Sequence, residues 1–137
     1  MRKVPRQKRS RALVDSLVEA ATLVIAEEGL ESATTVRIAE RAGVSVGSLY
    51  QYFDRKEDIY EAVLDRVAQQ LEVLVAEEMR RLPNGEISSF VRELLNRVWA
   101  FLEADDGRYL SILRYWVQLD GMYLISKLEQ KVSHWCE

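Results

Sequence analysis

The sequence predicts an all-α protein made of two helical parts. Apolar residues recur at steps of three and four along several long stretches, which is the period of a helix with one buried face. The 2 prolines and 6 glycines lie outside those periodic runs, so nothing interrupts the expected helices. The hydrophobic content of 48% is typical of a packed globular chain and too high for a disordered one.

The net charge of −3 averages two unlike halves of the chain. Residues 1–56 hold 10 Lys/Arg and 7 Asp/Glu, a net charge of +3, while residues 57–137 hold 9 and 15, a net charge of −6. Six of the cations fall within the first eleven residues, which contain no acid. This asymmetry favours an N-terminal part that meets a polyanion, and a solvated basic terminus without a partner is the alternative.

Several classes of protein are disfavoured by what the sequence contains. No apolar run is long enough to span a bilayer, and no apolar segment of a secretory signal follows the basic N-terminus. Cys136 is the single cysteine, which favours a reducing cytoplasm. His134 and Cys136 do not share a helix face, so we expect no metal site. We also expect no enzyme and no cofactor, because no nucleophile–base pair or glycine-rich phosphate loop is present.

The first helix is expected from near Ser10 to Gly29, where glycine suits the positive φ that follows a helix end. Its apolar stripe is Leu13, Leu17, Ala20, Ala21 and Val24.

The next two helices are short and lie close together in the sequence. Thr34 is a suitable N-cap for a helix over Thr35–Ala42, with Ile38, Ala39 and Ala42 on its apolar face. Gly43 then provides a sharp turn, and a third helix is expected over Val46–Phe53. Two helices joined by a three-residue turn that contains glycine are the pattern of a helix-turn-helix.

Later helices are expected over the rest of the chain. Asp54 and Glu57 resemble a capping box that begins a long fourth helix, which ends near Arg81 before the sequence LPNGE. Three further apolar patterns follow, over about Phe90–Leu102, Tyr109–Val117 and Leu124–Trp135, and ADDG separates the first two. We therefore divide the chain into a helix-turn-helix domain over residues 1–54 and a helical regulatory domain over residues 55–137.

The third helix is too short to be stable alone, so it must pack on one side and leave the other free. At about 100° per residue, Leu49 and Phe53 share the buried face, and Gly47 and Gln51 lie opposite. The margins between these faces carry Tyr50 and Tyr52, whose rings can pack while their hydroxyls reach a phosphate. Gly47 would allow close approach of a groove, and Gln51 could reach base edges.

The run TTVRIAERAGVSVGSLYQYFDRKEDIYEAVL closely resembles the DNA-binding region of the tetracycline-repressor (TetR) family, over about residues 10–65. The resemblance implies a homodimeric transcriptional regulator, usually a repressor, on a palindromic operator of double-stranded DNA. It also implies a small effector that binds the C-terminal helical domain and releases the operator.

The resemblance also implies roles for individual residues, with Arg37 departing from the acid that the family often has there. Thr34, Thr35 and Arg37 would touch the DNA backbone from the second helix. Val46, Gly47, Ser48 and Gln51 would enter the major groove, and Ser45 beside them would also contact the DNA. Tyr50, Tyr52 and Lys56 would clamp phosphates. Val46 and Gly47 offer few side-chain hydrogen bonds, so we expect DNA shape to contribute to recognition.

The C-terminal half is rich in aromatic residues that would line a pocket for an apolar or aromatic effector, as the resemblance implies. An ordinary helical core is the alternative for each of them. The candidates are Phe90, Trp99, Tyr109, Tyr115, Trp116 and Tyr123. Family members are usually longer, so we expect that this domain is incomplete or that dimers form through another surface.

We therefore expect a ligand-responsive DNA-binding repressor in the cytoplasm. The alternative from another class is a helical protein-interaction module without sequence-specific DNA binding. An enzyme that uses the aromatic cavity is a third alternative, which the lack of catalytic residues disfavours.

Overall fold

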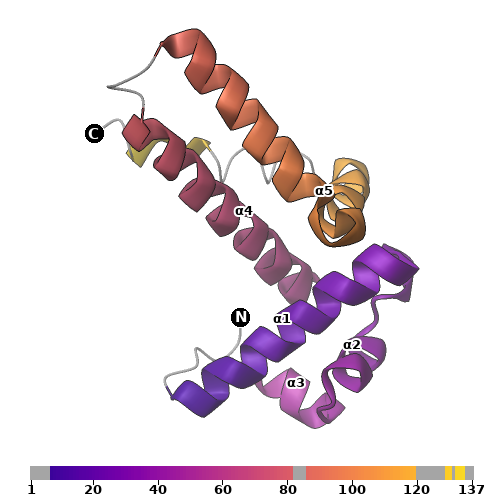
Figure 1. Cartoon of the computed structure of the whole chain (residues 1–137). Coiled ribbons are helices and arrows are strands. Elements are labelled where there is room, and N and C mark those ends of the chain that lie inside the picture. The colour runs from indigo at the N-terminus through magenta and orange to yellow at the C-terminus, as the bar shows by residue number, and fades with distance from the viewer. Residues whose placement is uncertain (1–6, 82–85, 120–128, 131, 135–137) are drawn as a thin grey trace. The chain divides into compact units, whose positions relative to one another are not determined.

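The computed structural model describes residues 7–81, 86–119, 129–130 and 132–134, and every regular element within these ranges is a helix (Figure 1). This confirms the all-α prediction. The elements are α1 (Lys8–Glu28), the 3₁₀ turn η1 (Leu30–Ser32), α2 (Thr35–Ala42), α3 (Val46–Tyr52), α4 (Lys56–Arg81) and α5 (Ile87–Leu119).

The chain forms two compact units, Met1–Asp65 and Arg66–Glu137, that meet within α4. The first turns of α4 therefore belong to the N-terminal unit, whereas the sequence analysis placed the domain boundary between residues 54 and 55. That functional boundary stays a prediction. The core of the first unit includes Leu17, Val24, Ile25, Ile38, Ala39, Leu49, Phe53, Ile59 and Val63, all at 1% exposure or less.

The α1 helix ends at Glu28 because Gly29 changes the direction of the chain. Gly29 has φ 93° and ψ 162°, and its N–H donates to the Ile25 carbonyl at 3.0 Å. The positive φ agrees with the sequence analysis, but the extended ψ is a conformation that is essentially restricted to glycine. It leads the chain into η1 instead of continuing the helical turn.

The turn between α2 and α3 has the geometry that the sequence predicts. Gly43 adopts a left-handed conformation with φ 73° and ψ 28°. Its N–H donates to the Glu40 carbonyl at 3.1 Å, and the Val44 N–H donates to the Ala39 carbonyl at 3.0 Å. These two bonds form a Schellman motif, which satisfies the last carbonyls of α2 and aims the chain toward α3. In the first unit α2 packs against both α1 and α3 (Figure 1).

The first turns of α4 are joined to the connector after α1 by Tyr60, to which the sequence analysis gave no role. The Tyr60 hydroxyl donates to the Ala33 carbonyl at 2.8 Å and lies 3.3 Å from the Leu30 carbonyl. Burial, and then the nearby charge of Glu57, raise the pKa of the Tyr60 hydroxyl. Helix α4 begins at Lys56, slightly later than the expected Asp54.

In the second unit, α5 consists of two helical segments separated by an irregular turn. Ala104 is extended, and Asp105, Asp106 and Gly107 have positive φ values of 53°, 61° and 73°. The rings of Phe101 and Tyr109 stack across this turn with centroids 4.6 Å apart. The turn coincides with the ADDG sequence, so the predicted separation of a fifth and a sixth helix is confirmed.

The seventh helix, predicted over about Leu124–Trp135, lies mostly outside the described residues. Within that range, residues 129–130 and 132–134 are helical.

We predict that Tyr60→Phe lowers the free energy of unfolding at neutral pH by about 1 kcal/mol, because one buried hydrogen bond is lost. The raised pKa of Tyr60 means that its contribution is present at neutral pH and is lost as pH rises through about 10 and above. The difference in stability between wild type and variant should therefore shrink in alkaline solution. Urea unfolding followed by circular dichroism measures it, with Tyr115→Phe as the control for tyrosine ionisation. A difference that is constant across pH would contradict the role of the Tyr60 hydroxyl.

Candidate nucleic-acid interface

Helix α3 has one buried face and one exposed face, as its sequence predicts. Leu49 and the following Phe53 are both at 0% exposure, while Gly47 and Gln51 are exposed. Val46 is half-buried at the start of the helix. Because Leu49 and Phe53 hold α3 in the core, the opposite face is presented to solvent on a rigid support.

Ser45 and Ser48 are linked at the N-terminus of α3. The Ser45 Oγ accepts a hydrogen bond from the Ser48 N–H at 3.1 Å and donates to the Ser48 Oγ at 2.9 Å. Ser45 is therefore the N-cap of α3, a role that the sequence analysis did not assign to it. Since Ser45 supplies this hydrogen, the hydroxyl hydrogen of Ser48 can be directed to a ligand outside the helix.

Tyr50 connects α3 to α2 through its hydroxyl. The Tyr50 hydroxyl and the Thr35 Oγ1 are 3.0 Å apart, and either can be the donor. Tyr50 is 39% exposed, and it lies between solvent and core, as predicted. The pair places two hydroxyl groups together where α2 and α3 lie side by side.

Tyr52 does not lie where the sequence analysis placed it. It was expected at the margin of α3 with its hydroxyl reaching outward, but the side chain is only 4% exposed. Tyr52 is the last residue of α3, where the chain leaves for α4, and its ring is covered by the protein. A contact between Tyr52 and DNA stays a prediction, which this burial disfavours.

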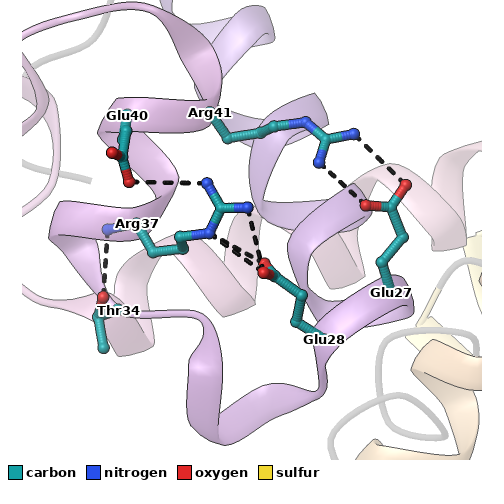
Figure 2. A network of polar contacts seen from close by, with 6 residues as sticks. All are labelled: Glu27, Glu28, Thr34, Arg37, Glu40 and Arg41. Carbon is teal, nitrogen blue, oxygen red and sulfur yellow. Dashed lines mark hydrogen bonds and ion pairs between the residues drawn. The ribbon is translucent and has the colours of Figure 1, made fainter.

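The two arginines of α2 form ion pairs with the C-terminal end of α1 (Figure 2). Arg37 pairs with Glu28 at 3.1 Å and lies 3.6 Å from Glu40, and Arg41 pairs with Glu27 at 2.9 Å. The hydrogen bond to Glu28, and then its charge, raise the pKa of the Arg37 guanidinium. These arginines therefore orient α2 on α1, and a DNA contact by Arg37 stays a prediction.

The start of α2 is exposed to solvent. The Thr34 hydroxyl accepts a hydrogen bond from the Arg37 N–H at 3.1 Å, which confirms the predicted N-cap. Val36 is 61% exposed beside Thr35, and the sequence analysis overlooked it. The sequence does contain a sign of this exposure, because Val36 is an apolar residue that lies outside the Ile38–Ala39 face of a strongly amphipathic helix.

Gly47 and Lys56 add two further features to this surface. A Cβ atom built on Gly47 would have only the Ser45 Oγ nearby, at 3.9 Å, so nothing inside the protein requires glycine there. Lys56 is exposed in the first turn of α4. A cation at a helix N-terminus, whose backbone N–H groups also attract anions, is a suitable place for a phosphate.

The described candidates for an effector pocket do not gather into one enclosed site. Tyr109 is buried at 7% exposure and stacks on Phe101, whereas Trp99 is 54% exposed and does not line an enclosed pocket. Phe90 and Tyr115 are half-buried. Tyr123 and the side chain of Trp116 lie outside the described part of the chain. A pocket built from these residues stays a prediction.

Neither a metal site nor a membrane span is found in the described part of the chain. No group of three or more His, Cys, Asp or Glu side chains there is arranged to hold a metal ion. None of the helices described has the length and apolar character that a membrane span requires.

Comparisons with known proteins show which family the helix-turn-helix resembles. Residues 17–63 match the profile described as bacterial regulatory proteins, tetR family. The chain is 28% identical over 125 residues to the HTH-type transcriptional regulator BetI of Klebsiella pneumoniae (strain 342). This match covers 91% of this chain and 62% of that protein. BetI of Escherichia coli (strain K12 / DH10B) has the same identity and coverage. The chain therefore spans less than two thirds of the length of these relatives.

Two solved structures share the fold. The fatty acid degradation regulator FadR from Bacillus halodurans superposes with a TM-score of 0.69 at 24% identity, over 88% of this chain and 63% of that one. A TetR-family transcriptional regulator from Haemophilus influenzae RD also has a TM-score of 0.69 and 24% identity, over 84% of this chain and 62% of that one. At this identity the two structures support the fold alone.

We predict that the two serines at the start of α3 differ in their effect on stability. Ser45→Ala removes the N-cap and should lower the free energy of unfolding by about 1 kcal/mol. Ser48→Ala keeps the cap and should change that free energy by less than about 0.5 kcal/mol. Urea unfolding of both variants tests this, and equal losses would show that Ser45 does not cap α3.

Proposed function

We propose that this chain is a transcriptional regulator of the tetR family, whose profile residues 17–63 match, and that it binds double-stranded DNA through α3. The observation that carries the proposal is the arrangement of α3, with Leu49 and Phe53 buried beneath it and Gly47 and Gln51 exposed above. A rigid helix that presents small and amide side chains is suited to the major groove.

Phosphate contacts would position the protein on the duplex. The hydroxyl groups of Tyr50 and Thr35 would contact a phosphate, and Lys56 adds a positive charge at the start of α4. The basic residues 1–11 would add contacts with the backbone or minor groove. Contacts of this kind provide affinity without sequence preference.

Base recognition would rest on a small set of side chains. Gln51 can form paired hydrogen bonds with adenine, and the Ser48 hydroxyl can donate to an acceptor on a base edge. Val36 is an exposed apolar side chain that suits the methyl group of thymine. Val46 and Gly47 would contribute close contact with the groove and no side-chain hydrogen bonds, so DNA shape would supply part of the specificity.

Regulation forms the second part of the proposal. The protein would act in the cytoplasm as a homodimeric repressor on a palindromic operator, without catalytic activity, and an apolar or aromatic effector would bind its second unit. Helix α4 runs through both units, so a change in the second unit could alter its angle and with it the spacing of two recognition helices. Such an effector would favour the state that cannot bind DNA.

We predict that duplex binding weakens steeply with salt, because Lys and Arg release counterions from the phosphates. Tyr50→Phe and Lys56→Ala should weaken binding alike for all sequences, while Gln51→Ala should relax the preference at one base pair by roughly 1–3 kcal/mol. Fluorescence anisotropy with duplexes selected from a random library, at several salt concentrations, measures both effects. Unchanged affinity in all three variants would favour the protein-interaction alternative.

We also predict that Gly47→Ala separates folding from DNA binding. The added methyl group meets no atom closer than 3.9 Å, so the variant should be as stable as wild type or gain up to about 1 kcal/mol. If α3 enters the groove, the same methyl group should lower DNA affinity by about tenfold or more. A Gly47→Ala variant with wild-type affinity would contradict entry of this face into the groove.

A further inference from the structure

Glu78 is a carboxylate in the second unit that is completely buried, at 0% exposure. Its Oε1 accepts a hydrogen bond from Arg97 Nη1 at 2.6 Å and lies 3.6 Å from Arg81 Nη1. Its Oε2 is also buried, and among the described residues it has no hydrogen-bond partner. One oxygen of the carboxylate is therefore well paired, and the other is left without a donor.

A buried oxygen of this kind is costly to the fold. A buried acceptor without a partner costs roughly 1–3 kcal/mol, and a charged group costs more. Arg97 already satisfies Oε1, so a purely structural bond between α4 and α5 does not need the second oxygen. Well-packed apolar residues often serve as well as a buried ion pair. The free oxygen therefore points to a donor that lies outside the described residues.

The charges around Glu78 favour a donor that is also a cation. Arg97 Nη2 pairs with Glu77 at 2.6 Å, and Arg81 also lies 3.9 Å from Glu93. The hydrogen bond from Arg97 holds the pKa of Glu77 below its usual value, so Glu77 is ionised at neutral pH. This ion-paired set joins three carboxylates to two guanidinium groups, and the charge of Arg80 also acts on Glu77, so the set has no excess of positive charge that would repel a cation. A cationic donor forms a stronger hydrogen bond with a carboxylate oxygen than a neutral donor does.

We propose that Glu78 Oε2 binds the protonated amine of a small organic ligand in the second unit. An N–H group would satisfy the unpaired oxygen, and its positive charge would strengthen the hydrogen bond to the carboxylate. A neutral alcohol could supply the hydrogen bond alone, and an anion could supply neither. The inference rests on the proposed function, since it adds an amine to the apolar or aromatic effector that would regulate DNA binding.

Isothermal titration calorimetry with benzylammonium chloride tests the proposal, because this probe joins a ring to a protonated amine. Wild type should bind it at least tenfold more tightly than benzyl alcohol, which has the same ring and no charge. Glu78→Gln keeps the shape of the side chain but removes its charge, and it should weaken binding by tenfold or more. Glu77→Gln is the matched control, since Glu77 shares Arg97 but is 44% exposed, and it should stay within about threefold of wild type.

A measurement on wild type alone covers the case in which Glu78→Gln fails to fold. Carbon-13 labelling of glutamate should show a shift of the Glu78 Cδ resonance on addition of benzylammonium, and a smaller shift with benzyl alcohol. Equal binding of the two probes, or unchanged binding by a folded Glu78→Gln, would overturn the proposal. No response of Glu78 to either probe would mean that the oxygen holds only water, which also overturns it.

DNA binding without any probe separates this inference from the proposed function. If the duplex binds normally and benzylammonium does not bind, only the amine site is wrong. If benzylammonium binds at Glu78 and DNA affinity is unchanged, the amine site stands and effector regulation through it is wrong.

Discussion

The candidate interface depends on the burial of Leu49 and Phe53, because α3 has only 7 residues and a helix of that length does not form alone. Packing of these two side chains fixes which face of α3 meets solvent. The left-handed Gly43 sets the direction from which α3 arrives, and Ser45 satisfies its first backbone donors. Without that packing, Gly47, Ser48 and Gln51 would have no defined arrangement.

The ion pairs between α1 and α2 complement this packing. Exposed ion pairs of this kind contribute little to stability on their own. Arg37 and Arg41 nevertheless direct two bonds from one helix to adjacent acids, Glu28 and Glu27, so together they specify how α2 is rotated on α1. The positive charges of Arg37 and Arg41 are therefore paired with acidic side chains of α1. In the proposed function, the phosphate contacts would come from hydroxyl groups, from Lys56 and from the basic N-terminus.

The second unit relies on a different use of charge. Arg97 reaches from α5 to two neighbouring acids of α4, and one of these, Glu78, is completely buried. A fork of two N–H groups can hold both carboxylates at once, which a lysine could not do with the same geometry. This cluster joins the two helices by polar contacts inside a unit whose other described buried residues include Leu74, Tyr109 and Ile112.

The sequence by itself determined the local features of this protein. The helices, the turn at Gly43, the cap at Thr34 and the break at ADDG follow from periodicity and backbone preference, which act within a few residues. The buried Leu49 and exposed Gln51 follow from the same period. Only the tertiary structure decided the burial of Tyr52, the pairing of Arg37 with Glu28, the bond from Tyr60 to Ala33 and the unpaired oxygen of Glu78. Each of these joins separate elements or depends on what covers a side chain, and no local pattern encodes which distant groups will meet.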